Sequence, residues 1–90
     1  MPTVHFPPTQ PAYTPNDTVA FQVVIDGRLA TAEITSEALQ DRFGASGRRS
    51  NDLLIAFKKN RREIEDIARV KLPKRVSAGR GLLVTVDFAR

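Results

Sequence analysis

Apolar and polar residues alternate from Thr18 onward, which is the pattern of a β-strand with one buried face. Asp26-Gly27 follows, and this pair favours a two-residue hairpin turn because both central positions need a positive φ. A second strand is therefore predicted after Gly27. The residues that share the apolar face of the first strand are Val19, Phe21, Val23 and Ile25.

A hairpin closed at Asp26-Gly27 gives the two strands a self-consistent register. A slip by one residue would turn Phe21 and Val23 to the polar face, so the pattern specifies the pairing. The predicted pairs are Val23–Ala30, Phe21–Ala32 and Val19–Ile34 on the apolar face, and Gln22–Thr31 and Ala20–Glu33 on the other.

Two helices are predicted after the hairpin. Thr35 can cap the first, and Gly44 marks its end, because glycine often takes the left-handed conformation just after a helix. A longer helix is predicted from about Asn51 to Lys71, since the residue before Pro73 avoids helical angles. Its apolar stripe consists of Leu53, Phe57, Ile64, Ile67 and Ala68.

The ends of the chain complete the predicted fold. Residues 1–17 hold five of the six prolines and are predicted to be a partly irregular leader, with at most a short edge strand at 3–6. Residues 81–88 alternate again and predict a last strand with Leu82, Val84, Val86 and Phe88 on one face. The expected core is Val19, Phe21, Val23, Ile34, Leu39, Phe43, Phe57, Ile64, Ile67, Val84 and Val86.

This order of elements predicts one α+β domain over residues 18–90. We expect two layers, with an antiparallel or mixed sheet of three to four strands and two helices on one face. A chain of 90 residues is too short to divide its apolar residues between two cores.

The composition argues against an enzyme. The chain has no cysteine, and its one histidine, His5, lies in the leader. A nucleophile activated by a neighbouring histidine is therefore not expected, and neither is a common zinc site. We therefore expect no enzymatic activity, no cofactor and no metal. No apolar run approaches the roughly 18 residues of a membrane helix, so a soluble cytoplasmic protein without a membrane partner is expected.

The most charged stretch, FKKNRREIED at residues 57–66, is interpreted as a solvated helix face. Spacings of four place acids beside bases at Lys59–Glu63, Arg62–Asp66 and Glu65–Arg69. Asn60 lies within the apolar stripe, where an amide needs a hydrogen-bond partner. Either it ties the helix to a neighbouring backbone, or it shares a small polar pocket with Arg61.

The charge is unevenly distributed along the chain. Residues 1–41 have one basic and five acidic residues, a net charge of −4, whereas residues 42–90 have 13 basic and five acidic residues, a net charge of +8. Two clusters of bases are candidate contacts for an anion or a nucleic acid. The first is Arg48 and Arg49, which precede the long helix, and the second is the stretch of residues 69–80, which contains no acid and has the bases Arg69, Lys71, Lys74, Arg75 and Arg80.

Two functions remain open on these grounds. The first is a protein-interaction module, where a strand edge or the outer sheet face (Val24, Leu29, Leu83) meets a protein partner or a second copy. The alternative is nucleic-acid binding. Gly44-Ala-Ser-Gly47 links the two helices and resembles the Gly-x-x-Gly loop of KH domains, which clamps a nucleic-acid backbone.

Three segments of the chain resemble a known family. VAFQVVIDGRLATAEITSEAL, DRFGA and AFKKNRREIEDIA are similar to the small bacterial domain-of-unknown-function family numbered fourteen-eighty-eight, over residues 18–72. The resemblance implies a compact α+β fold and a bacterial source, and it implies no activity. The matching pattern residues are Val19, Phe21, Gly27, Ile34, Ala38, Leu39, Phe57, Asn60, Arg61, Ile64 and Ala68.

Overall fold

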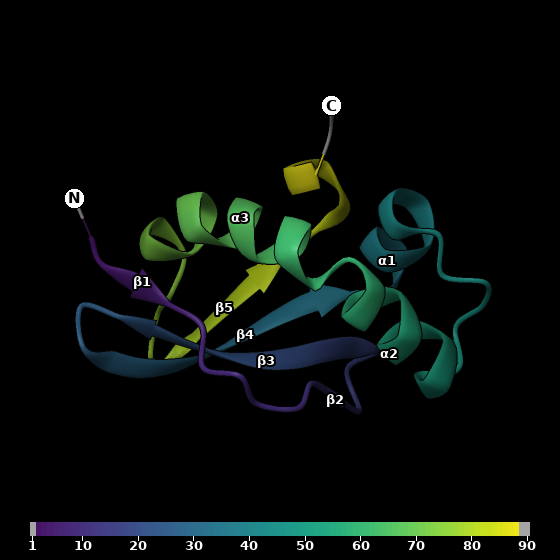
Figure 1. Cartoon of the computed structure of the whole chain (residues 1–90), viewed down its shortest axis with the longest axis horizontal. Coiled ribbons are helices and arrows are strands. Elements are labelled where there is room, and N and C mark those ends of the chain that lie inside the picture. Colours follow the sequence, from purple (N-terminus) through teal and green to yellow (C-terminus); the bar gives the residue numbers. More distant parts are fainter. Residues whose placement is uncertain (1, 89–90) are drawn as a thin grey trace.

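The predicted hairpin forms the centre of the sheet (Figure 1). The computed structural model describes residues 2–88, in which β3 (Thr18–Ile25) pairs antiparallel with β4 (Arg28–Thr35). Asp26 and Gly27 have φ values of 50° and 81°, as the predicted turn requires. All five predicted residue pairs are present, so the register read from the alternation is confirmed.

Three further strands complete a mixed sheet. β1 (Val4–His5) and β2 (Ala12–Tyr13) both pair antiparallel with β3, and β5 (Arg80–Leu83) pairs parallel with β4. The strand order is β1-β3-β4-β5, with β2 also beside β3. The predicted α+β class and the edge strand near the N-terminus are confirmed, whereas β2 within the proline-rich leader was not predicted.

The first helix, α1 (Ser36–Phe43), has the predicted ends. The Thr35 hydroxyl accepts a hydrogen bond from the N–H of Ala38 at 3.1 Å, which caps the helix start. Gly44 has a φ of 70° and ends the helix in the left-handed conformation.

The predicted long helix is wrong as a single element, because it is divided at Asn60. α2 spans Ser50–Lys59 and α3 spans Arg61–Lys71, and Asn60 between them has φ −113° and ψ 17°. The carbonyl of Ala56 accepts hydrogen bonds from both the backbone N–H and the side-chain amide of Asn60, at 3.1 and 2.9 Å. A 3-10 turn, η1 (Leu72–Lys74), follows α3 and includes Pro73.

The last predicted strand is wrong beyond Leu83, where β5 ends. Residues 85–88 form the 3-10 turn η2, because the carboxylate of Asp87 accepts the N–H of Val84 at 2.8 Å and curls the chain. The buried face is also the opposite of the predicted one. Leu83 is fully buried, whereas Leu82 is exposed, Val84 is half-buried and Val86 is 70% exposed.

The core lies between the sheet and the helices. The rings of Phe21 on β3 and Phe57 on α2 meet with centroids 5.0 Å apart, which confirms the predicted layer contact. Phe88 of η2 packs on Phe43 at the end of α1, with centroids 5.1 Å apart. The predicted core residues that are buried are Val19, Phe21, Val23, Ile34, Leu39, Phe43, Phe57 and Ile64, and Ile67 is partly buried.

Candidate functional site

One face of the sheet carries the three α-helices, and no described helix covers the other (Figure 1). We call this second surface the outer face. Leu29 and Leu82 on it are 62% and 46% exposed, whereas Leu83, which was predicted to lie there, is buried under the helices. By strand pairing, the outer face comprises His5, Ala12, Thr18, Ala20, Gln22, Val24, Leu29, Thr31, Glu33, Thr35, Arg80 and Leu82.

The charged side chains of Glu33 and Arg80 neutralise each other on the outer face. The Glu33 carboxylate accepts a hydrogen bond from the Thr18 hydroxyl at 2.6 Å and forms an ion pair with Arg80. The bond from Thr18, and then the Arg80 guanidinium, hold the pKa of Glu33 below its ordinary value. Glu33 is therefore ionised at neutral pH and fully engaged in holding β3, β4 and β5 together.

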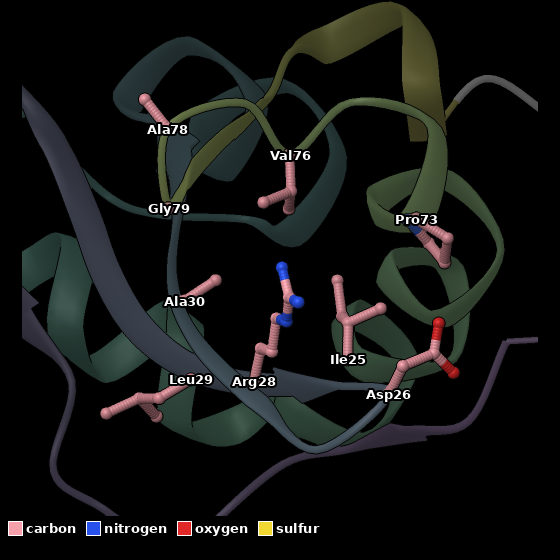
Figure 2. Close-up of a pocket in the computed structure, with 9 residues that line it drawn as sticks. All are labelled: Ile25, Asp26, Arg28, Leu29, Ala30, Pro73, Val76, Ala78 and Gly79. Atoms are coloured by element: carbon pink, nitrogen blue, oxygen red, sulfur yellow. The ribbon is translucent and has the colours of Figure 1, made fainter.

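A groove lies beside the first residues of β4, where this strand extends beyond its pairing with β5. The pairing of β5 with β4 starts at Thr31, so Arg28, Leu29 and Ala30 have no neighbouring strand on that side. The open groove has a volume of about 710 Å³ (Figure 2). It is lined by Ile25, Asp26, Arg28, Leu29, Ala30, Pro73, Val76, Ala78 and Gly79.

Arg28 supplies an unpaired positive charge to this groove. Its guanidinium extends into the middle of the groove, between Ile25 and Val76 (Figure 2). No hydrogen bond or ion pair engages Arg28 side-chain atoms within residues 2–88. The carboxylate of Asp26 instead accepts the N–H of Thr3 at 2.9 Å.

Four of the candidate anion-binding residues have partners, contrary to the expectation that they are unpaired. Arg48 forms an ion pair with Asp17 at 2.7 Å, Arg75 pairs with Asp87, and Arg80 pairs with Glu33. Arg69 donates to the carbonyl of Val4. The three acids lie 31, 12 and 47 residues from their bases, so a search for acids nearby in the chain could not find them, and the partner of Arg69 is a backbone group.

The remaining candidate bases are Arg49, Lys71 and Lys74. None of the three forms an ion pair within the part of the chain that the structure describes. Lys71 does act on Asp87 at longer range, and its charge contributes to lowering the pKa of that carboxyl.

Asn60 and Arg61 hold segments of the backbone together. The Asn60 amide donates to the carbonyls of Phe43 at 3.2 Å and Ala56 at 2.9 Å. Arg61 turns towards the leader and donates to the carbonyls of Thr9 at 2.8 Å and Pro7 at 3.3 Å. The two side chains thus serve different contacts and do not share a pocket.

The ion pairs within residues 57–66 also differ from the predicted ones. Glu65 pairs with Arg61 at 2.9 Å in place of Arg69. No ion pair links Arg62 with Asp66, and Lys59 lies in a different helix from Glu63. The face remains solvated, because Lys58, Lys59, Arg62 and Asp66 are all exposed.

The Gly-x-x-Gly link between α1 and α2 has an acidic neighbour. A Cβ on Gly47 would lie 2.8 Å from a carboxylate oxygen of Asp52, and the Ser46 hydroxyl donates to Asp52 at 3.4 Å. Asp52 stands in the first turn of α2, where a helix favours an anion. Its carboxylate would repel a phosphate held by this link.

No described helix is long and apolar enough to cross a membrane. Within residues 2–88, no group of three or more His, Asp or Glu side chains is arranged to hold a metal ion.

Comparison with known proteins yields one match. A family model described as "Protein of unknown function (DUF1488)" matches residues 4–83. No curated protein and no solved structure matches the chain. The matched range includes most of the leader and all of β5, so it extends beyond residues 18–72, which carry the resemblance in the sequence.

Proposed function

The chain belongs to the DUF1488 family of proteins of unknown function, and from this premise we propose that it is a non-enzymatic module that binds another protein. The outer face of the sheet carries the proposal. Leu29 and Leu82 are exposed there with no described helix over them, so this face offers apolar surface that a partner could remove from water. The chain has no cysteine, which suits the reducing bacterial cytoplasm in which we propose that it acts.

The hydrogen bonds of three carboxylates support the proposal that the protein is not an enzyme. Asp17, Glu33 and Asp87 each have a lowered pKa, because hydroxyl or guanidinium groups bond to them. A general acid at neutral pH needs a raised pKa and access to a substrate. These three groups instead join segments of the chain, so their chemistry is structural.

A pull-down with a salt series and one matched pair of variants tests the proposed interface. We expect one protein, or a second copy of the chain, to remain bound at high salt, because an apolar contact is not screened. Leu82→Glu places a charge on the outer face and should abolish this binding. Val86→Glu is the control, since Val86 is also exposed but lies on η2, away from the outer face. Equal retention by both variants would contradict the proposal.

Nucleic-acid binding is the alternative. Arg49, Lys71 and Lys74 favour it because they lack ion pairs among the described residues, whereas Asp52 beside Gly47 opposes it. The same protein titrated with labelled single-stranded RNA and DNA separates the two functions. We expect no binding at low salt. Binding that falls in Arg49→Ala or in the double variant Lys71→Ala/Lys74→Ala, with a salt slope lower by about one unit per lost phosphate contact, would replace the proposal.

A further inference from the structure

We propose that the groove beside Arg28 binds an extended acidic segment of the partner protein as an added strand on β4. The inference rests on the proposed function, because it names the chemistry of the segment that such a partner would present. Three features of the groove lead to it: the open backbone of Leu29, the unpaired charge of Arg28 and the apolar walls.

The backbone of Leu29 is directed into the groove. In an antiparallel pair, successive residues point their N–H and C=O groups to alternate sides. The N–H of Thr31 donates to the carbonyl of Gly79 at 2.8 Å, on the side of β5. The backbone N–H and C=O of Leu29, two residues earlier, therefore point to the same side. β5 does not reach Leu29, so the backbone N–H and C=O of Leu29 have no partner strand. An extended peptide could hydrogen-bond to both groups.

The outer edge of β5 does not offer the same opportunity. Ser77 and Arg80 exchange backbone hydrogen bonds of 2.8 and 3.1 Å across the turn formed by Ala78 and Gly79. Arg75 donates to the carbonyl of Leu82 at 3.4 Å. This edge is covered by its own loop, so an added strand is directed to β4 instead.

The charge and the walls of the groove define the segment. Side chains of an added strand alternate between the two faces of the sheet. A residue opposite Leu29 would contact that exposed side chain on the outer face, whereas its neighbours would face Arg28 and Ala30 on the helix side. Arg28 matches a carboxylate, and the wall formed by Val76 and Pro73 matches an apolar group. The expected segment is therefore an acidic residue followed or preceded by two apolar residues.

Two blocked peptides test the inference on the full-length protein. The geometry does not favour one strand direction, so the probes are acetyl-Ser-Glu-Val-Val-Ser-amide and acetyl-Ser-Val-Val-Glu-Ser-amide. We expect one of them to shift the Leu29 amide signal in nitrogen-15 NMR and to protect that amide from hydrogen exchange. The same peptide with Gln in place of Glu should bind at least fivefold more weakly.

A matched pair of variants tests the role of Arg28. Arg28→Gln should weaken peptide binding about tenfold, the size expected for losing a charge-assisted bond. Arg42→Gln removes the same charge from an exposed site on α1 and should leave the affinity unchanged. No shift at Leu29 with either peptide, equal binding of the Gln peptide, or equal affinity of both variants would overturn the inference.

The two proposals can fail separately. If Leu82→Glu abolishes the pull-down but neither peptide binds, the partner uses the outer face alone and the groove inference is wrong. If a peptide binds as expected but no partner survives high salt, the groove inference stands and the outer-face interface is wrong. A Gln peptide with a free C-terminus that binds as well as the Glu peptide would show that a chain end, and not an acidic side chain, occupies the groove.

Discussion

Asp87 shows how one carboxylate redirects a chain that alternates like a strand. It is almost completely buried, pairs with Arg75 from the loop before β5, and accepts the N–H of Val84. The bond from Arg75, followed by that from Val84, lowers the pKa of Asp87 although its burial opposes this. The resulting turn carries Phe88 back into the core against Phe43.

This arrangement predicts a loss of stability in acid. A carboxyl group whose pKa is lower in the folded state stabilises the fold above its unfolded pKa of about 3.9, and this stabilisation is lost as the pH falls through the folded pKa. The free energy of unfolding should therefore fall as the pH is lowered from 5 towards 3. Asp87→Asn should cost about 1 to 3 kcal/mol at pH 7 and make this fall shallower.

Urea denaturation at pH 7 and pH 3 measures the effect. Asp41→Asn is the control, because Asp41 is exposed on α1. This substitution should leave the free energy of unfolding unchanged at both pH values. Part of the acid sensitivity should persist in Asp87→Asn, since Asp17 and Glu33 have pKa values shifted in the same direction. An Asp87→Asn variant as stable as the parent at pH 7 would contradict the account.

Among the elements, the joint between α2 and α3 is tied to its surroundings by one side chain, that of Asn60. The amide of Asn60 reaches the last carbonyl of α1 and the carbonyl of Ala56, so one side chain connects three helices. Phe57 and Ile64 still lie on the same buried side, seven residues apart across the break. The spacing of the apolar residues is therefore the same on both sides of Asn60, and a search for helical periodicity does not detect the break.

Asn60→Leu should destabilise the protein by about 1 to 2 kcal/mol, because it leaves the carbonyl of Phe43 without this partner in a half-buried site. Thermal unfolding followed by circular dichroism measures the change. Asn51→Leu, in the exposed first turn of α2, is the matched control and should have little effect. A higher midpoint for Asn60→Leu would show that the amide is dispensable.

At the scale of the whole molecule, the proline-rich leader is packed as part of the sheet. Val4 is buried, and the ring of Phe6 lies 6.1 Å from that of Phe21. Arg61 and Arg69 bind leader carbonyls, and Arg69 also stands over the Phe6 ring at 5.3 Å. The family match from residue 4 includes this segment.

The predicted boundary, with a leader at 1–17 and a domain at 18–90, stays a prediction that truncation can test. A chain beginning at Thr18 loses β1, β2 and the burial of Val4 and Phe6, so we expect it to be less stable by more than about 3 kcal/mol. Arg61→Met/Arg69→Met should loosen the leader with a smaller loss, and Arg62→Met is the control. Urea denaturation gives the values, and equal stability of the truncated chain would mean that residues 18–90 fold independently of the leader.

The sequence by itself determined the hairpin, its register, both ends of α1 and the α+β class. Those signals are local, since alternation, a turn at Asp26-Gly27 and a cap at Thr35 each depend on residues that are near in the chain. The family was also recognisable from the strand and helix segments, and the match to residues 4–83 confirms it.

Tertiary structure alone decided the partners of Arg48 and Arg80 and where the groove lies. Arg48 and Arg80 meet acids 31 and 47 residues away, so no local spacing could reveal those pairs. The buried face of β5 was decided by its parallel pairing with β4, and the groove exists because that pairing begins only at Thr31. Contacts between distant segments depend on how the layers pack, and this is the information that periodicity along one chain does not contain.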